Sequence, residues 1–545
     1  MHDANLSTCP KMSTALVPTC PVPSQAESRL DAETTLFSEA GAAVSPDMLS
    51  RVLVEHYRCP SEFLKFVQSG DEAGAVGYFR FGPNICYGHA NSGTLPSEAK
   101  GLLEDVSLET VVAEGTVALP FDPNEIVDNL RLERYPHRRL SRCENILKKA
   151  YYSLRPFTNQ SVRKQIQKFR ARNWQNLAFP RWPVDTTVED ICESLLSLAM
   201  QASGAERVPF VWFWPHGIRG CVMMTHDVES AAGKDFCAEL LDINDSFGIK
   251  ASFQIVPEER YEVPSTLLEA IRGRGGEVGI QDLNHDGRLF DDRGEFRRRA
   301  ALINRYGQEY AAQGFRAAIL YRKPEWYGDL EFSYDMSIPN VAHLDPQRGG
   351  CCTVMPYFIG KVLELPVTTV QDYTLFHLLN ERSIALWETQ VGLILEKNGL
   401  ASFIVHPDYV RDRDTRTVYE DLLAYLRDLR EKAAAWFALP REVDAWWRAR
   451  SQMSIVRHGN SWRIEGPGAD RAVLAFANNI KGKVVYELAD EKRGAVSASK
   501  NAALSSSNDF LQNVVRPSND EKQYCHHRGR TLWSLGSRSP QGPRC

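Results

Sequence analysis

An alternation of short apolar runs and amphipathic segments begins near residue 219 and limits the fold more than any other feature of this chain. The apolar runs CVMMT, IKASFQIV, EVGI, FRAAILY and ASFIV are typical of buried strands. Between them, segments such as DFCAELLDINDSFG, PSTLLEAIRGRGG and EFRRRAALINRYGQEYAAQG have helical spacing, and Gly248 suits the end of the first. Strands that alternate with helices over short links predict an α/β fold with a parallel sheet, either open or closed into a barrel.

Polar side chains follow several of these predicted strands. Asp227 and Glu229 end the first, with one residue between them, so they point the same way if the strand continues to that point. His285 comes shortly after EVGI, Tyr321 ends FRAAILY, and His406 follows ASFIV. Reactive residues of parallel α/β folds gather at the carboxyl ends of strands. We therefore expect these side chains to share one rim of the sheet.

Carboxylates and imidazoles together make a donor set for zinc, iron, cobalt or nickel. A further carboxylate can act as a general base, and a further histidine as a general acid. Arg316, the second residue of FRAAILY, can hold such a base in position. Each residue also has a plainer interpretation. Asp227 and Glu229 can cap the helix that follows them, and the histidines and Arg316 can be structural.

Five motifs carry a resemblance to a known family. They are THDVE, GEVGIQDLNHDG, GFRAAILYRKPEW, LELPVT and FIVHPDY, and they occur in this order within residues 219–410. The ordered set resembles the successive motifs of the polysaccharide deacetylases (NodB-homology, carbohydrate esterase family 4). The resemblance implies a distorted (β/α) barrel that removes N- or O-acetyl groups from glycans with a divalent metal.

The resemblance also implies roles for individual residues. Asp227 matches the catalytic base, Arg316 the arginine that orients it, and His406 the catalytic acid. Glu229 and His285 match metal ligands. Around them we expect a substrate groove whose lining includes Tyr321, Trp326 and Asp335.

The chain departs from the family pattern at Gln281, where the first histidine of the metal pair is expected. An amide oxygen can bind a metal, but more weakly than an imidazole. Three outcomes stay open. The site binds metal through Glu229, His285 and Gln281, it recruits Asp282 or Asp286, or it has lost metal and catalysis while keeping the fold.

These observations predict a metal-dependent hydrolase that removes an acetyl group from an N-acetylated sugar, with zinc as the expected cofactor and iron, cobalt or nickel as alternatives. The substrate would be an N-acetylated glycan or a lipid-linked glycan precursor. One alternative is a glycan-binding protein on the same fold without activity. Another is a hydrolase of small amides, which a closed pocket would favour over an open groove.

Outside the motifs, the sequence suggests further divisions. We expect a barrel over residues 206–412, flanked by the following segments: disorder over 1–48, a mixed α+β extension over 49–205, helices over 413–452, a small β appendage over 453–488 and a disordered tail over 489–545. The aromatic strings FPRWP and FVWFWPHG in front of the barrel are either core or platforms for sugar rings.

Charge and hydropathy bear on partners and location. The formal net charge is −5, so we expect no nucleic-acid partner. No apolar run is long enough to cross a bilayer, and the first residues lack the apolar core of an export signal, so we expect a cytoplasmic protein. A basic amphipathic segment over 161–175 would suit peripheral contact with the inner face of a membrane, or is simply a solvated helix face.

Overall fold

The computed structural model describes residues 49–70, 74–113, 115–136, 165 and 174–489. The disorder predicted for 1–48 and 489–545, and the basic segment predicted over 161–175, fall almost wholly outside these residues.

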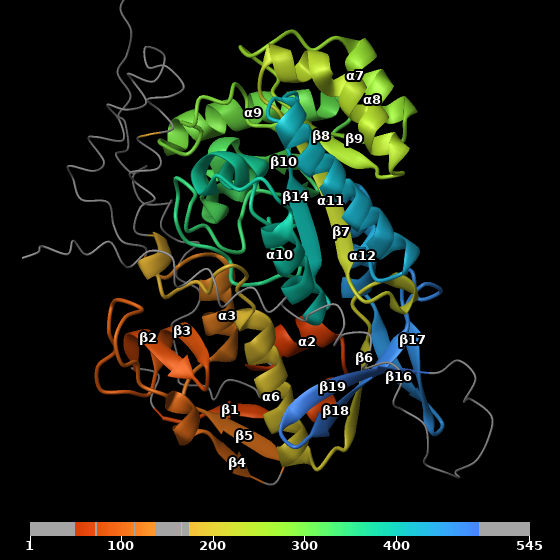
Figure 1. The fold of residues 1–545 in the computed structure, drawn as a ribbon. Helices are drawn as coiled ribbons and strands as arrows, with labels where there is room; N and C mark the ends of the chain where they lie inside the picture. Colours follow the sequence, from red (N-terminus) through yellow and green to blue (C-terminus); the bar gives the residue numbers. More distant parts are fainter. Residues whose placement is uncertain (1–48, 71–73, 114, 137–164, 166–173, 490–545) are drawn as a thin grey trace, which may run out of the picture. The chain divides into compact units, whose positions relative to one another are not determined.

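A curled, mostly parallel sheet forms the centre of the fold (Figure 1). Its parallel part has the spatial order β14–β7–β8–β9–β10–β11–β13, and the strands are β7 (Cys221–Val228), β8 (Ala251–Ile255), β9 (Glu277–Gln281), β10 (Gly314–Arg316), β11 (Tyr334–Asp335), β13 (Val362–Glu364) and β14 (Leu400–Ile404). Strand β12 (Tyr357–Ile359) adds antiparallel to β13, and β15 (Trp436–Phe437) also pairs with β7. The predicted α/β class is confirmed.

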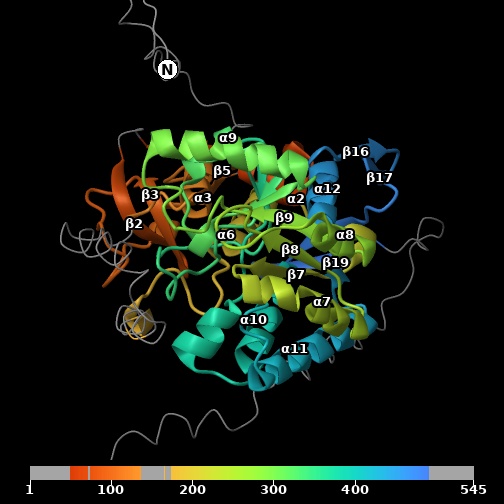
Figure 2. The same ribbon diagram turned by 90° about the horizontal axis from the view of Figure 1, so that it is seen from above.

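Helices cover the outer side of this sheet (Figure 2). They are α7 (Ala231–Ser246), α8 (Ser265–Gly273), α9 (Arg293–Glu309), α10 (Ala385–Glu396) and α11 (Arg413–Glu431). Side-chain caps begin three of them: Ser230 accepts a hydrogen bond from the Gly233 amide, Asp292 from Glu295, and Asp412 from Asp414. Each helix buries an apolar face against the strands, because burial of that face supplies most of a helix's stability in a folded protein.

The two ends of the curled sheet are linked by the segment after β13. On one side, the Asn340 amide donates to the Val367 carbonyl and the Val367 amide donates to Ile338. On the other side, Thr368 Oγ1 accepts from the Ser402 amide at 2.9 Å and donates to the Leu400 carbonyl at 2.6 Å. Side-chain hydroxyls thus replace part of the backbone hydrogen bonding of a regular sheet, so the sheet is irregular at this point.

The strand predicted over FRAAILY is shorter than expected. Strand β10 ends at Arg316, and a 3₁₀ turn, η6 (Ala318–Leu320), follows. Ile319 and Leu320 have positive φ angles of 60° and 54°, which no strand residue adopts. The apolar run leaves the sheet because Leu320 packs with Val367 and Ile404, a contact that a straight strand would not make.

The elements before the barrel pack into a mixed region joined to it. They are α2 (Arg51–Tyr57), β1 (Phe66–Gln68), β2 (Ala75–Phe81), β3 (Asn84–Ala90), β4 (Val111–Ala113), β5 (Thr116–Leu119), α3 (Pro123–Arg131) and α6 (Thr187–Ser203). Glu133 forms a buried ion pair with Arg322, and Arg131 accepts a hydrogen bond from Tyr357. Both contacts join this region to loops of the barrel.

Six short helical turns complete the connections beside η6: η1 (Ser61–Phe63), η2 (Val106–Glu109), η4 (Trp174–Asn176), η5 (Pro215–Gly217), η7 (Pro324–Asp329) and the π-helix η8 (Thr374–Leu379). The described residues include no helix long and apolar enough to cross a membrane.

The C-terminal strands are integrated with the segment in front of the barrel. After α12 (Pro440–Ser451), strands β16 (Ser454–His458) and β17 (Ser461–Glu465) form the predicted hairpin. Strands β18 (Leu474–Ile480) and β19 (Lys483–Leu488) follow, and β18 pairs antiparallel with β6 (Arg207–Val211). The residues predicted to be a small appendage therefore share a sheet with the aromatic string FVWFWPHG, most of which is buried.

Candidate active site

Asp227 and Arg316 form a buried ion pair at the carboxyl ends of β7 and β10. Arg316 Nη1 lies 2.6 Å from Asp227 Oδ1, and both side chains are almost completely buried. The same nitrogen donates to Thr225 Oγ1, and Arg316 Nε donates to the Met336 carbonyl. These contacts fix the guanidinium in one position. Asp227 is thereby held with one carboxylate oxygen on Arg316 and the other toward the rest of the rim.

Gln281 lies between the two carboxylates. Its Nε2 donates to Asp227 Oδ2 at 3.2 Å and to Glu229 Oε1 at 3.1 Å. Its Oε1 is buried and has no hydrogen-bond partner. An amide presents one donor end and one acceptor end. Here the donor end faces the two carboxylates, so the oxygen faces them only when the amide is turned over.

Glu229 is the residue on which the two histidines converge. Its Oε1 lies 2.7 Å from His285 Nε2 and 3.4 Å from His406 Nε2. Burial alone would raise the pKa of Glu229, but the neighbouring His285 and His406 rings hold it well below its usual value. Glu229 is therefore a carboxylate at neutral pH and can bind a cation.

Asp372 orients His406. Its Oδ1 lies 2.7 Å from His406 Nδ1, and its Oδ2 accepts from the His406 amide at 2.7 Å. Burial alone would lower the pKa of His406, but Asp372 and Glu229 raise it well above its usual value. The ring is thus held as an imidazolium whose Nε2 faces the rim, as a general acid requires.

The donor atoms of the rim fit a divalent cation. Ligand atoms of Asp227, Glu229 and His406 lie within 4.8 Å of one another. His285 Nε2 is close to Glu229 but forms no hydrogen bond of normal geometry with it, and it can bind an ion only in the tautomer whose proton is on Nδ1. Carboxylates and imidazoles are the ligands expected for zinc and its neighbours in the first transition row.

Nine residues were expected at the site from the sequence. The structure brings six of them together at the rim, and the other three lie elsewhere. Those at the rim are Asp227, Glu229, Gln281, His285, Arg316 and His406. Their chemical roles stay predictions.

The groove residues predicted from the sequence are placed elsewhere. Tyr321 is 7% exposed and belongs to the hydrophobic core, because the chain turns after β10. Asp335 is 1% exposed and lies within β11, where Ser337 satisfies its carboxylate. Trp326 packs against Phe290 and Phe296 at helix α9. That these three residues line a substrate groove stays a prediction, and the burial of Tyr321 and Asp335 does not favour it.

His226, which alternates with Asp227 along β7, points away from the rim and has a structural role. It is buried, with Nδ1 on the Val405 carbonyl and Nε2 on Asn244. Burial lowers its pKa to about 4, so it stays neutral.

Sequence reasoning missed two residues of the site. Asp372 follows the LELPVT motif in the string TTVQDY, and an acid directly after a motif of the series was the only available signal. Arg260 donates from Nη2 to His285 Nδ1 at 3.2 Å and to the His285 carbonyl at 2.7 Å. Because Arg260 only donates, this contact requires an unprotonated Nδ1 on His285. It therefore opposes the tautomer in which His285 Nε2 binds a metal.

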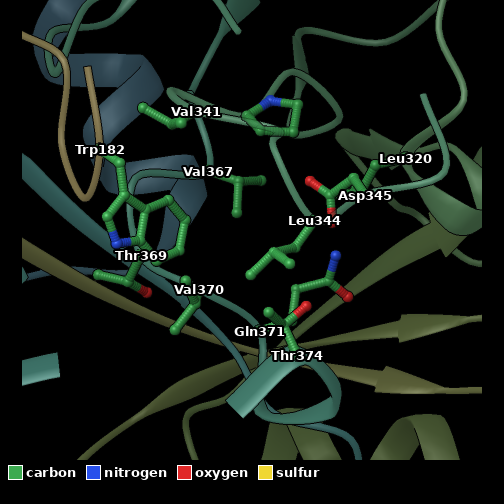
Figure 3. Close-up of a pocket in the computed structure, with 11 residues that line it drawn as sticks. Trp182, Leu320, Val341, Leu344, Asp345, Val367, Thr369, Val370, Gln371 and Thr374 are labelled. Atoms are coloured by element: carbon green, nitrogen blue, oxygen red, sulfur yellow. The ribbon is translucent and has the colours of Figure 1, made fainter. Parts of the chain in front are cut away.

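A small pocket lies among the segments after β10, β11 and β13 and the region in front of the curled sheet (Figure 3). It has these lining residues: Trp182, Leu320, Pro339, Val341, Leu344, Asp345, Val367, Thr369, Val370, Gln371 and Thr374. None of the six rim residues is among them, although Gln371 directly precedes Asp372 in the chain.

No family model matches the sequence. No curated protein matches it either.

Solved structures do match this chain. A protein described as a polysaccharide deacetylase from Mycobacterium smegmatis is 17% identical, with a TM-score of 0.37, over 46% of this chain and 98% of its own. The allantoinase Puue is 13% identical, with a TM-score of 0.35, over 43% of this chain and 92% of its own. A family 4 acetyl xylan esterase from Clostridium thermocellum, solved with a cobalt ion, is 15% identical, with a TM-score of 0.27, over 42% of this chain and 91% of its own. Polysaccharide deacetylases of carbohydrate esterase family 4 are thus among the solved structures that this chain resembles at low identity and over part of its length.

Proposed function

We propose that this protein is a metal-dependent hydrolase that removes the acetyl group from an N-acetylated sugar. The observation that carries the proposal is the convergence of an oriented carboxylate, Asp227, and an oriented imidazolium, His406, on either side of Glu229. A base and an acid with fixed positions and opposite charge states are what amide hydrolysis needs.

Three residues would hold the metal: Glu229, His285 in the tautomer with its proton on Nδ1, and Gln281 with its amide turned so that Oε1 faces Glu229. A bound divalent cation would supply Lewis-acid polarisation of the acyl carbonyl and of the attacking water. Zinc suits this mixed oxygen and nitrogen set, and iron, cobalt and nickel are alternatives.

The protein's own groups then account for the proton transfers. Asp227, fixed by Arg316 at 2.6 Å, accepts a proton from water as the water oxygen bonds to the acyl carbon. His406, fixed by Asp372, donates its Nε2 proton to the departing nitrogen as the carbon–nitrogen bond breaks. The products are acetic acid, which releases its remaining proton to solvent and leaves as acetate, and the free amine of the sugar. Transfer of the proton from Asp227 back to His406 through solvent restores the starting charges, so atoms and charge balance.

A second function has its own support. The Gln281 amide already joins Asp227 to Glu229, and the cationic Arg260 lies beside His285. Both features stabilise the rim without a metal. A protein that binds glycans without hydrolysing them is therefore the alternative, and the assay below separates the two.

The test is acetate release from linear N-acetylglucosamine oligomers by protein supplied with zinc or cobalt. We expect release by the wild type and a loss of at least about 100-fold in Asp227→Asn, since a positioned base contributes roughly that much. Asp421→Asn, an exposed aspartate of α11, is the matched control and should keep full activity. Absence of metal-dependent release, or equal release by Asp227→Asn, would overturn the proposal.

A further inference from the structure

Arg260 contacts His285 through the ring nitrogen that does not face Glu229. Its Nη2 lies 3.2 Å from His285 Nδ1 and donates to the His285 carbonyl at 2.7 Å. Its Nε donates to the Asn284 carbonyl at 3.2 Å. One guanidinium therefore makes three contacts with the chain segment that carries His285, although the Arg260 side chain itself is exposed.

The backbone at His285 is held in an uncommon conformation. His285 has a positive φ angle of 56° and is 2% exposed. Positive φ angles are uncommon for residues other than glycine. The bonds from Arg260 to the carbonyls of Asn284 and His285 help to hold the ring where its Nε2 lies 2.7 Å from Glu229 Oε1.

A histidine that binds a metal needs a particular partner on its other ring nitrogen. The nitrogen bound to the metal carries no proton, so the other nitrogen carries it and donates it to a carboxylate, a carbonyl or water in almost all metal sites. At His285 the nitrogen toward the rim is Nε2, so Nδ1 would have to donate. Arg260 has donors only and meets Nδ1 with another N–H. The contact is therefore the reverse of the usual one.

The acidic residues near His285 do not supply the acceptor. Asp286 is bound through both carboxylate oxygens by Arg299, at 2.9 Å each. Asp282 accepts from the Leu283 amide with one oxygen, and its other oxygen is buried without a hydrogen-bond partner. Among the described residues, Arg260 is thus the hydrogen-bond partner that His285 Nδ1 has.

Gln281 shows the same preference for donors on the other side of the rim. Its Nε2 donates to Asp227 at 3.2 Å and to Glu229 at 3.1 Å. The two carboxylates are therefore satisfied by N–H groups, as His285 Nδ1 is by Arg260. Two independent contacts thus stabilise an arrangement that a metal ion would have to displace.

Resting on the proposed function, we propose that Arg260 sets the metal affinity of the rim by holding His285 in the tautomer that cannot bind a metal through Nε2. Metal binding then requires Arg260 to leave Nδ1, so the ion competes with a donor of the protein itself. The exposed position of Arg260 permits this exchange. Its side chain can turn into solvent, and water can then accept the proton of Nδ1.

The test measures zinc binding to the full chain by isothermal titration, which needs no turnover. In Arg260→Ala water can accept the Nδ1 proton, so zinc should bind at least about tenfold more tightly than in the wild type, a size typical of changes in the partners of metal ligands. Arg260→Lys keeps a cationic donor and should stay within a few-fold of the wild type. Arg288→Ala, which removes an exposed arginine from the same loop, is the matched control for lost charge and should also stay within a few-fold.

The sign of the change separates this role from a purely structural one. If Arg260 only held the loop in place, Arg260→Ala would loosen His285 and weaken zinc binding, and a loss of fold would do the same. The gain should also depend on the ring. Arg260→Ala combined with His285→Ala should bind zinc no more tightly than His285→Ala alone.

Three results would overturn the inference. One is zinc binding by Arg260→Ala that is absent, or no tighter than in the wild type. Another is an equal gain in Arg288→Ala, which would assign the effect to charge alone. The third is a gain that persists when His285 is replaced by alanine.

Failure of this inference and failure of the proposed function give different results. Unchanged zinc affinity in Arg260→Ala, beside zinc-dependent acetate release by the wild type, would remove the role of Arg260 and leave the hydrolase. Tighter zinc binding by Arg260→Ala, in a protein that releases no acetate with any metal, would support the role of Arg260 and remove the hydrolase.

Discussion

Asp372 holds His406 by two contacts, 2.7 Å from Oδ1 to Nδ1 and 2.7 Å from Oδ2 to the backbone amide. One carboxylate therefore fixes both the ring and the main chain of the proposed acid. In Asp372→Asn the shape is kept, but the charge that favours the imidazolium is lost. We expect kcat for acetate release to fall by about 100-fold with little change in KM. The acid-to-amide change is small enough that circular dichroism and the unfolding temperature should remain close to those of the wild type. If KM and kcat both fall and the variant also loses its fold, the role assigned to Asp372 would be contradicted.

Arg316 and Asp227 are both buried, so removing one leaves the other unpaired. Arg316→Met should lower the free energy of unfolding by about 3–5 kcal/mol, measured by urea denaturation, because an uncompensated buried charge is costly. Asp227→Asn combined with Arg316→Met should recover part of that loss. If the double variant is no more stable than Arg316→Met alone, the two side chains do not form an interacting pair in solution.

Glu277 predicts a pH dependence of stability separate from the active site. It is 5% exposed at the start of β9, and burial raises its pKa from 4.5 to about 7. Between these two pH values the folded protein therefore retains a proton that the unfolded chain has released. The contribution of protonated Glu277 to the free energy of unfolding is fully present below about pH 4.5 and is lost as the pH rises through about 7. Glu277→Gln removes the loss. It should be more stable than the wild type at pH 8 by roughly 1–3 kcal/mol, and no more stable at pH 4. Denaturant titrations at the two pH values measure the difference, and an equal effect at both would contradict the shift.

Gln281 is the position at which metal affinity can be raised. Its amide nitrogen donates hydrogen bonds to the carboxylates of Asp227 and Glu229, so an imidazole placed there would face Glu229 and His285. Gln281→His should bind zinc at least about tenfold more tightly than the wild type, since imidazole is a better ligand than an amide oxygen. Isothermal titration with zinc measures the change. Gln308→His, on the outer helix α9, is the matched control and should leave the affinity unaltered; weaker binding in Gln281→His would show that the amide has another role.

The α/β class and the rim were predictable from sequence because both depend on local patterns. The apolar runs of β7, β9 and β14 lead into polar residues, and parallel strands bring such ends to one edge. Asp372 was not predictable in the same way. Its contact with His406 depends on the irregular path of residues 366–372, which is set by the hydroxyl contacts of Thr368 and not by any strand pattern.

The chain after β10 was predicted least well for a related reason. Tyr321, Trp326 and Asp335 were expected at a groove from the family resemblance and, for Tyr321, from its place at the end of a predicted strand. The left-handed residues Ile319 and Leu320 turn the chain before Tyr321, and such a turn has no signal in an apolar run. One wall of the small pocket comes from Trp182, more than 130 residues before Leu320 in the chain, and sequence alone left its string FPRWP as either core or sugar platform.

The most direct test of the central claim is the metal content of the purified full chain, measured by elemental analysis beside two histidine variants. If the acid and imidazole groups of the rim form a metal-dependent hydrolytic site, the wild type should hold about one zinc, iron, cobalt or nickel ion per chain. His285→Ala should lose it, and His458→Ala, an exposed residue of β16, should keep it. A wild type that stays empty after incubation with these metals, or a metal that His285→Ala retains, would contradict the claim.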